Sequence, residues 1–390
     1  MSGQFVYSVK KVLFVTNDFP PQSGGIETFI AGLISQLPRD SVVVHTSSQK
    51  NLNQQEKYDE DIFETLGAIV VRDRQRILLP TPGLQKRVLG TVHAHGIDTV
   101  IFGSSVPLGL LAPSLRKHGV RKMVAITHGH EVWWSRVPIF SAALRRVCSQ
   151  VDAITFLGNF TKSAISRAMR APDRKKLIHL PPGVDTDFFT PGEKPEYLVE
   201  RYNLKDKKII LCAGRLVQRK GQDVLIDALS ILRERDENIH LLIVGAGNYE
   251  KELRMRVEKL NLNSFVTFTG RVGYHELPDH FRLADIFASP TRDRFGGLEV
   301  EGLGIVYLEA SASGIPVLAG NSGGAPDAVQ DGRTGLVRDG RSVEIIAETL
   351  QELLENHNLR SEMGKEGREW MERDWSWRVI GGRFRALLNF

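Results

Sequence analysis

The sequence predicts an α/β protein with two doubly wound parallel-sheet domains that face a cleft. Its 390 residues suffice for two domains of roughly 150 residues or more each. Short apolar runs rich in β-branched residues alternate with amphipathic stretches, and the alternation restarts after a Pro- and Gly-rich stretch near residue 190. Strands that alternate with helices form parallel sheets covered on both faces. Ligands of such sheets bind at the carboxyl ends of the strands, which is why we expect a cleft.

The first half contains short apolar runs of strand length. These runs are Val12–Thr16, Val42–His45, Ala68–Val71, Thr99–Phe102, Val124–Thr127, Ala153–Phe156 and Leu177–Leu180. Stretches with helical spacing lie between them and include Glu27–Leu37, Leu108–His118, Phe140–Cys148 and Thr161–Met169. The order strand, helix, strand predicts the first parallel sheet.

The second half repeats this order. Its expected strands are Ile209–Ala213, Leu241–Val244, Phe265–Thr269, Ile286–Ser289 and Pro316–Ala319. Its expected helices are Gly221–Arg235, Tyr249–Leu260, Glu276–Ala284, Val306–Ser313 and Ser342–Asn356. Because Pro and Gly gather near residue 190, we expect domains at 1–190 and 191–374, followed by an amphipathic terminal segment at 375–390.

Composition excludes several classes of protein. Apolar residues make up 42% and charged residues 25%, which is ordinary for a folded chain and excludes a disordered or collagen-like one. Cys148 and Cys212 are the only cysteines, too few for a disulfide framework, and they fit a reducing cytosol. No apolar run approaches the ~20 residues that cross a bilayer, and we expect no signal peptide. A cytoplasmic protein is therefore expected.

The net charge of +5 is divided unevenly between the halves. Residues 1–195 hold 24 Lys/Arg and 16 Asp/Glu, a net +8, whereas residues 196–390 hold 27 and 30, a net −3. A basic half predicts an anionic partner: nucleic acid, a phosphorylated ligand or an anionic membrane. Composition does not choose among these, but the chain has no recognised nucleic-acid reading motif, which disfavours nucleic acid.

The segment Pro20–Glu27 (PPQSGGIE) follows the first expected strand and opens a helix. Its adjacent Gly24 and Gly25 allow the backbone to approach a ligand closely, and the helix start offers free N–H groups and a positive dipole. Phosphate fits such a place. A plain strand-to-helix turn is the alternative, and the segment alone does not decide between them.

The segment Gly214–Gly221 (GRLVQRKG) stands at the equivalent place after the first strand of the second half. The guanidinium of Arg215 can bind two phosphate oxygens, and the ammonium of Lys220 adds a compact charge. Together they can hold a diphosphate and stabilise it as a leaving group. A solvated basic loop is the alternative, but a glycine at each end favours a shaped turn and phosphate binding.

The segment Glu301–Glu309 (EGLGIVYLE) carries two carboxylates that would lie about 80° apart on one helix. Its glycines oppose helix formation at the start. We therefore expect Glu301 in a loop and Glu309 inside the following helix, with the N–H groups of Gly304 and Ile305 directed at a ligand. The carboxylates can then accept hydrogen bonds from separate sugar hydroxyls, although each alone would usually be a surface residue.

The segment Thr127–Glu131 (THGHE) ends a strand of the first half. Histidine and glutamate invite a zinc interpretation, but the spacing is not His-Glu-x-x-His and no third ligand is evident. We expect no metal and a hydrogen bond from His128 to substrate instead. Two weaker signals are Gly245–Gly247, which lacks the last glycine of a dinucleotide fingerprint, and Asp185–Asp187, interpreted as a turn.

The Gly-Gly loop, the Arg-Lys loop and the Glu-x7-Glu segment, in this order, resemble the retaining glycosyltransferases of family 4 over essentially the whole chain. That resemblance implies the GT-B fold, with two Rossmann-like domains. Within the family, several segments are similar to those of the actinobacterial phosphatidylinositol mannosyltransferases. These segments are Thr16–Pro21, His128–Val132, Arg219–Asp223, Val300–Glu309 and Asn321–Pro326. Two departures from the family pattern are Trp133-Trp134 and Phe295, which stands in place of a glycine.

The resemblance implies a role for each candidate residue. His128, Arg215, Lys220 and Glu301 would be catalytic: Arg215 and Lys220 at the diphosphate, Glu301 at the mannose, and His128 near the reacting carbon. The further donor-binding residues would be Glu309 at the ribose, Gly304 and Ile305 at the sugar and phosphate, Arg271 and Val272 near guanine, and Gly24 and Gly25 over the diphosphate.

The implied reaction transfers mannose from GDP-mannose to phosphatidylinositol monomannoside, in α-1,6 linkage, with neither metal nor cofactor. The protein would then lie peripherally at the inner face of the plasma membrane, with basic residues of the first half against anionic lipid. A solvated basic face is the alternative. The candidate residues are Arg116, Lys117, Arg121, Lys122, Arg145, Arg146, Lys162, Arg167 and Arg170.

Three other functions remain open from the sequence. The first is a family 4 enzyme with another nucleotide-sugar donor or acceptor. The second is a nucleotide-sugar epimerase of the same GT-B fold. The third is a catalytically silent sugar-nucleotide binding module, although the presence of Arg215, Lys220, Glu301 and Glu309 argues against it.

Overall fold

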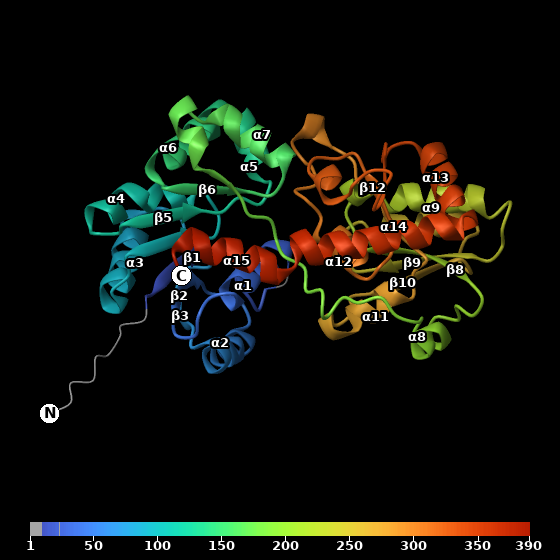
Figure 1. Ribbon diagram of the computed structural model, residues 1–390, viewed down its shortest axis with the longest axis horizontal. Coiled ribbons are helices and arrows are strands. Elements are labelled where there is room, and N and C mark those ends of the chain that lie inside the picture. Colours follow the sequence, from blue (N-terminus) through green and yellow to red (C-terminus); the bar gives the residue numbers. More distant parts are fainter. Residues whose placement is uncertain (1–9, 23) are drawn as a thin grey trace. The chain divides into compact units, whose positions relative to one another are not determined.

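The computed structural model describes residues 10–22 and 24–390. The chain divides into two compact units: the chain up to Gly183 together with Ile380–Phe390, and Val184–Val379. Each unit contains one parallel sheet with helices (Figure 1). This confirms the predicted α/β class with two parallel-sheet domains. The domain ranges expected from the sequence stay a prediction.

The first sheet has seven strands in the order β3-β2-β1-β4-β5-β6-β7. The strand order reverses between β1 and β4, and ligands of open α/β sheets bind where this happens. In register, Val12 of β1 lies opposite Val42 of β2 and Thr99 of β4. The strands are β1 (Val12–Thr16), β2 (Val42–Ser47), β3 (Ile69–Asp73), β4 (Thr99–Phe102), β5 (Lys122–Ala125), β6 (Ala153–Phe156) and β7 (Leu177–His179).

The connections of the first unit are helical. They are α1 (Gly25–Ser35), α2 (Leu52–Leu66), α3 (Pro82–His95), η1 (Leu108–Leu111), α4 (Ala112–Lys117), α5 (Glu131–Arg136), α6 (Pro138–Gln150), α7 (Asn159–Ala168) and η2 (Ala171–Lys176). The expectation of one helix over 108–118 is wrong in detail. A 3₁₀ turn, η1, leads into α4, because Pro113 lacks the N–H that a continuous α-helix would need there.

Both faces of the first sheet are buried. Leu13 and Val15 belong to one apolar core that includes side chains of α3, α4, α6 and α7. Phe14 points to the opposite face, where its ring centroid lies 6.3 Å from that of Phe384. Phe384 is on α15 (Trp377–Leu388), which Figure 1 shows in red beside β1 and α1. Arg385 anchors this helix by donating to the carbonyl of Gln36 at 2.8 Å.

The second sheet has six strands in the order β10-β9-β8-β11-β12-β13. Ile210 and Cys212 of β8 face a core formed with α9, α10 and α13, whereas Phe287 of β11 contacts Tyr307 on the other face, with ring centroids 5.9 Å apart. The strands are β8 (Lys208–Ala213), β9 (Ile239–Val244), β10 (Val266–Gly270), β11 (Ile286–Ser289), β12 (Val317–Gly320) and β13 (Gly335–Arg338).

Helices and helical turns also connect the strands of the second unit. They are α8 (Glu196–Arg201), η3 (Gln218–Lys220), α9 (Gln222–Leu232), α10 (Glu250–Lys259), η4 (Tyr274–Glu276), α11 (Leu277–Arg282), η5 (Phe295–Gly297), α12 (Ile305–Ala312), η6 (Ala325–Ala328), α13 (Val343–Glu355), α14 (His357–Trp370) and η7 (Met371–Trp375). The expected helix over 276–284 is shorter at both ends: α11 begins after η4, and past its last residue Ala284 N–H donates to the Phe281 carbonyl at 2.9 Å.

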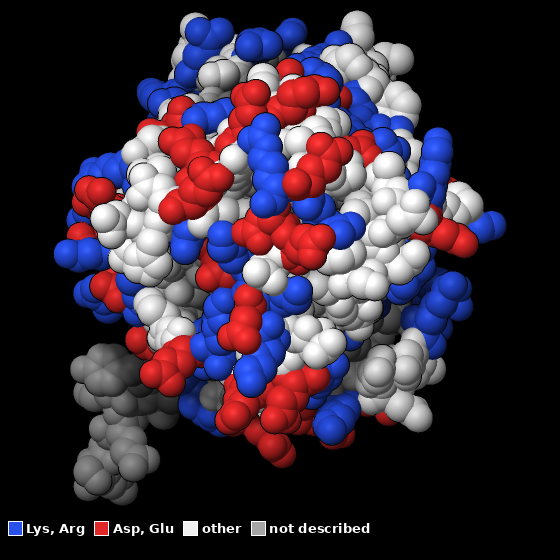
Figure 2. Space-filling view, turned by 90° about the vertical axis from the view of Figure 1, so that its right-hand side faces the viewer, with Lys and Arg blue, Asp and Glu red and all other residues white. Residues whose placement is uncertain are grey.

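The surface of the second unit carries both signs of charge. Figure 2, which views one of its faces, shows Lys and Arg mixed with Asp and Glu rather than gathered into one basic area. This distribution agrees with the near balance of 27 basic and 30 acidic residues in positions 196–390. Among the described residues, no helix combines the length and the apolar character that a membrane span requires.

Candidate functional site

The loop Gly214–Gly221 leaves β8 at its carboxyl end and leads through η3 into α9. Its backbone is fixed on the neighbouring loop that follows β9: Leu216 N–H donates to the carbonyl of Ala246 at 3.1 Å. A Cβ on Gly245 would lie 2.0 Å from the carbonyl oxygen of Gly214, and one on Gly247 would lie 2.1 Å from that of Leu216. The Gly245–Gly247 signal therefore reflects close packing of two loops.

Arg215 is exposed at this edge of the sheet. Its carbonyl accepts a hydrogen bond from the Gln222 amide at 3.2 Å, which holds the main chain in place. Within residues 10–22 and 24–390, no hydrogen bond or ion pair engages its guanidinium. A positioned backbone thus carries a cation whose donors remain available to an anion.

Lys220 lies in the same loop but is buried, with 7% of its surface exposed. Its Nζ lies 2.9 Å from Oε2 of Glu301, and Nη1 of Arg219 lies 2.5 Å from the same oxygen. Burial acts to raise the pKa of Glu301, but the charges of Lys220 and Arg219 outweigh it, so the pKa is lowered. Glu301 is therefore a carboxylate at neutral pH, and the site joins two predicted residues with Arg219, which the sequence did not indicate.

The main chain of Glu301 is fixed by the segment after β12. Glu301 N–H donates to Oγ of Ser322 at 3.2 Å, and that hydroxyl donates to the carboxylate of Asp293 at 2.6 Å. Gly324 N–H donates to the Glu301 carbonyl at 2.8 Å. The segment Asn321–Pro326 drew attention in the sequence only through its resemblance, and the structure shows that it supports the Glu301 loop.

The Glu-x7-Glu segment has the predicted division into loop and helix. Glu301 lies in a loop, and α12 begins at Ile305 after Gly304, whose φ is 89°. A Cβ at Gly304 would lie 2.5 Å from the ring of Tyr307, so both conformation and space require glycine. The N–H groups of Ile305 and Val306 have no backbone acceptor among the described residues and are available to a ligand, whereas Tyr307 N–H donates to the Gly304 carbonyl at 3.0 Å.

Glu309 lies in the middle of α12 and is 8% exposed. No described side chain or N–H hydrogen-bonds its carboxyl group. Burial raises the pKa of Glu309 to about 7, although the charge of Lys220 lowers it in part. A buried carboxyl kept near its titration point is unfavourable unless a ligand satisfies it.

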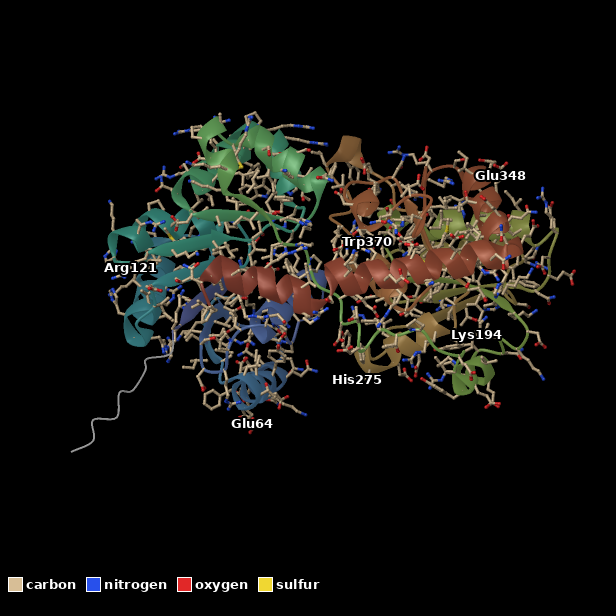
Figure 3. All side chains as sticks on the ribbon, viewed as in Figure 1. Glu64, Arg121, Lys194, His275, Glu348 and Trp370 are labelled. Carbon is tan, nitrogen blue, oxygen red and sulfur yellow. The ribbon has the colours of Figure 1, made fainter. Side chains whose placement is uncertain are left out.

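Arg271 and Val272 follow β10 in the loop that leads to η4. Arg271 is exposed and Val272 is partly buried. Gly245 N–H donates to the carbonyl of Gly270 at 2.8 Å, so this loop lies next to the one after β9. His275, labelled in Figure 3, lies in η4 on the same connection.

Gly24 and Gly25 stand at the start of α1 in the first unit: Gly24 is its N-cap and Gly25 its first residue. A Cβ on Gly24 would lie 2.3 Å from a carboxylate oxygen of Glu27. Ser23 of the same motif lies outside the described residues. The N–H groups of Gly25 and Ile26 begin this helix, and the start of a helix is a place that favours an anion.

His128 follows β5 and is held at two points. Its Nε2 lies 2.5 Å from the carbonyl of Gly103, and its backbone N–H donates to Glu131 at 3.0 Å. A carbonyl only accepts, so Nε2 carries the proton and Nδ1 is left as an acceptor. Burial lowers the pKa of His128, which keeps the ring neutral. Glu131 itself is buried and has a second role, since it also accepts from Gly129 N–H at 3.1 Å.

The remaining sequence signals have structural explanations. The carboxylate of Asp185 accepts from the N–H groups of Asp187 and Phe188, as the turn interpretation predicts. Trp133 and Trp134 pack on Phe140, with centroid distances of 4.8 and 4.7 Å. Across residues 10–22 and 24–390, no group of three or more His, Cys, Asp or Glu side chains has a metal-binding arrangement.

The sequence matches two known families. Residues 23–188 match Glycosyltransferase Family 4, and residues 196–370 match Glycosyl transferases group 1. A protein of Mycolicibacterium smegmatis named GDP-mannose-dependent alpha-(1-6)-phosphatidylinositol monomannoside mannosyltransferase is 44% identical, over 97% of this chain and 98% of its own. A Corynebacterium glutamicum protein named as the corresponding enzyme for a monoacylated substrate is 40% identical, over 97% and 98%.

Solved structures show the same fold at lower identity. Anabaena Alr3699/HepE in complex with UDP and glucose has a TM-score of 0.77 at 19% identity and covers 97% of this chain and 99% of its own. A sucrose-phosphate synthase from Thermosynechococcus elongatus has a TM-score of 0.77 at 18% identity and covers 97% and 98%.

Proposed function

We propose that this chain, which belongs to glycosyltransferase family 4, transfers mannose from GDP-mannose to phosphatidylinositol monomannoside in α-1,6 linkage. The observation that carries the proposal is similarity along nearly the whole chain. Relatives named for this reaction are 40% and 44% identical over 97% of the chain. This similarity covers both units and is not confined to one of them.

For the donor diphosphate we propose Arg215 and Lys220. The guanidinium of Arg215, which has no partner among the described residues, can bind two phosphate oxygens. Lys220 already contacts Glu301 at 2.9 Å, so it can add a hydrogen bond to phosphate without leaving its place, because an ammonium has three donors. Charge that develops on the departing diphosphate would be stabilised by both cations.

For the nucleoside we propose Glu309 and the loop after β10. The buried carboxyl of Glu309 lacks a hydrogen-bond partner among the described residues, and two ribose hydroxyls would supply donors to it. Arg271 and Val272 would lie beside the guanine. The first N–H groups of α12, at Ile305, together with the main chain at Gly304, would contact the sugar and phosphate.

For the mannose we propose Glu301 and His128. Glu301 is a carboxylate whose second oxygen can accept from a sugar hydroxyl, while Oε2 remains with Lys220 and Arg219. Neutral His128 would accept a hydroxyl hydrogen at Nδ1 near the reacting carbon. Gly24 and Gly25 would present backbone N–H groups to the diphosphate.

In the proposed reaction, the acceptor hydroxyl oxygen forms a bond to the anomeric carbon while the bond from that carbon to the diphosphate oxygen breaks. Attack comes from the same face as departure, through an oxocarbenium-like state, so configuration is retained. The departing diphosphate oxygen takes the proton of the acceptor hydroxyl. The protein's share is to place both substrates and to stabilise the leaving group.

No metal or other cofactor enters this proposal. Two cations and a helix start supply the positive charge that a divalent ion supplies in other transferases. Transfer that continues in excess EDTA would agree with this scheme, and transfer that stops and returns with Mg²⁺ or Mn²⁺ would contradict it.

For location we propose a cytoplasmic protein bound peripherally to the inner face of the plasma membrane through its basic first unit. Several of the candidate residues are exposed, including Lys117, Arg121, Lys162 and Arg170. Figure 3 labels Arg121 at the outer surface of this unit. Cations near an anionic surface contribute about 1 kcal/mol each to binding.

The donor assignment is tested by competition. GDP is expected to inhibit transfer from GDP-mannose far more strongly than UDP does. Equal inhibition by UDP, or sugar interconversion without an acceptor, would instead favour another family 4 donor or an epimerase.

A further inference from the structure

We propose that a pocket in the first unit binds a phosphorylated anion, at residues distinct from those proposed for the sugar nucleotide. The pocket has a volume of about 530 Å³, and Arg145, Arg146 and Arg170 line it together with the polar residues Ser149 and Gln150. The rest of its lining is uncharged, so no carboxylate faces the three guanidinium groups.

The arginines converge from two segments. Arg145, Arg146 and Ser149 share one face of α6, because residues three and four apart lie together on a helix. Arg170 comes from the residue that precedes η2, on a different connection. The tertiary fold therefore brings the three arginines together, because they do not come from one continuous basic segment.

One of the three arginines is anchored, and two are available. Nε of Arg145 donates to the carbonyl of Ala168 at 3.0 Å, which fixes the direction of its guanidinium. Within the described part of the chain, the side chains of Arg146 and Arg170 have neither an ion pair nor a hydrogen bond. The pocket thus offers one guanidinium group in a fixed position and two that have no partner among the described residues. Guanidinium groups bind the oxygens of a phosphate.

The nearby acids do not neutralise this charge. Asp152 is paired with Arg116 at 2.7 Å, and Asp173 is paired with Lys176 at 2.9 Å. Helix-dipole stabilisation does not account for these cations, because the last turn of α6 contains no basic residue and Arg170 lies outside that helix. The three arginine charges give the pocket a positive electrostatic potential, and a bound anion would reduce the repulsion between them.

The ligand class follows from the donor set. Several guanidinium groups favour a phosphate, with its three or more oxygens, over a single carboxylate. Ser149 and Gln150 can hydrogen-bond to hydroxyl groups attached to that phosphate. Both a soluble phosphoester and the phosphodiester of a lipid headgroup have this chemistry. None of these residues is assigned to the donor, but all three arginines are among the candidate membrane-facing residues, so the lipid source of the ligand rests on the proposed location.

The test compares the double variant Arg146→Gln/Arg170→Gln with a control of equal charge loss, Arg74→Gln/Arg76→Gln. Arg74 and Arg76 are exposed in the same unit and do not line the pocket. The first arm titrates inorganic phosphate at fixed ionic strength by calorimetry. The second arm measures sedimentation with vesicles of phosphatidylcholine, with and without phosphatidylinositol. Thermal unfolding checks that each variant is folded.

In at least one arm, the pocket variant should bind roughly tenfold more weakly than the control variant, because two guanidinium contacts to the anion are lost. Loss confined to free phosphate identifies a soluble phosphoester as the ligand. Loss of the phosphatidylinositol-dependent binding identifies a lipid headgroup. Equal behaviour of the pocket and control variants in both arms would overturn the proposal.

Discussion

Lys220 and Glu301 form a buried ion pair: each is 7% exposed, and Nζ lies 2.9 Å from Oε2. The pair joins the loop after β8 to the loop before α12. It links the cation proposed for the leaving group to the carboxylate proposed for the sugar, so displacement of either side chain would disturb both functions.

Replacing Lys220 should lower both the rate of transfer and the stability of the fold. Lys220→Met should lower the turnover of mannosyl transfer about 100–1000-fold, the usual effect of losing one leaving-group contact. It should also destabilise the fold by roughly 1–3 kcal/mol, because among the described cations Glu301 then keeps Arg219 alone. Steady-state kinetics and urea unfolding measure the two effects.

A second variant separates folding from catalysis. Lys220→Met/Glu301→Gln should recover most of the lost stability, since no unpaired charge remains buried, while transfer stays low. Lys205→Met, an exposed lysine in the same unit, is the control. Near-normal turnover in Lys220→Met would remove Lys220 from the mechanism.

Glu309→Gln should increase stability and weaken donor binding. The pKa of Glu309 is about 7 in the folded protein, above the usual value near 4.3 for an unfolded chain. The folded state therefore binds more protons between these two values, and stability falls as the pH rises through that window. Above pH 7 the ionised carboxyl costs about 2–4 kcal/mol, which the amide avoids.

The measurements for Glu309 are unfolding free energy at pH 4.5 and pH 8 and GDP affinity by calorimetry. Glu309→Gln should gain stability at the higher pH and little at the lower one, and should bind GDP about tenfold more weakly. Glu348→Gln on α13, labelled in Figure 3, is an exposed control that should change neither quantity. A variant with unchanged GDP affinity would contradict the ribose assignment.

Gly304→Ala should deform the start of α12. Its φ of 89° disfavours any side chain, and the added Cβ would meet the ring of Tyr307 at 2.5 Å. We expect a loss of about 1–3 kcal/mol and weaker GDP binding. Gly90→Ala in α3, where nothing lies within 4 Å, should instead stabilise by up to about 1 kcal/mol. Equal effects of the two substitutions would show that Gly304 is not required.

Membrane binding through the first unit should depend on anionic lipid and salt. Lys162→Gln/Arg167→Gln on α7 removes two proposed cations and should weaken binding to phosphatidylinositol-containing vesicles about tenfold or more at low salt. Binding to pure phosphatidylcholine should be weak for every variant. Vesicle binding that depends neither on lipid charge nor on ionic strength would contradict the proposed membrane-binding surface. The basic residues would then be interpreted as a solvated face.

Much of the fold was predictable because parallel strands are buried on both faces and read as short β-branched runs. β1, β4, β6 and β11 have the predicted bounds. β13 (Gly335–Arg338) was missed, since it begins with glycine and its last two residues are only partly buried. Pro113 explains why the expected helix over 108–118 is divided into η1 and α4.

Site residues were predictable from the sequence where a short local motif carries them. Contacts between loops that are distant in the sequence were not predictable, because they depend on the order of the strands in the sheet. Glu301 and Glu309 divide between loop and helix as their glycines indicate. Arg219 reaches Glu301 across 82 positions, and Ser322 supports the same loop from another strand end. No local pattern signals such contacts, because only the sheet order brings these loops together.

The central claim is tested most directly by one transfer assay. Purified protein is incubated with GDP-mannose and either phosphatidylinositol or its monomannoside, and the products are scored for number of mannoses and linkage. We expect transfer to the monomannoside alone, giving an α-1,6-linked second mannose. Efficient transfer to unmannosylated phosphatidylinositol, a different linkage, or turnover only with another sugar nucleotide would contradict the account.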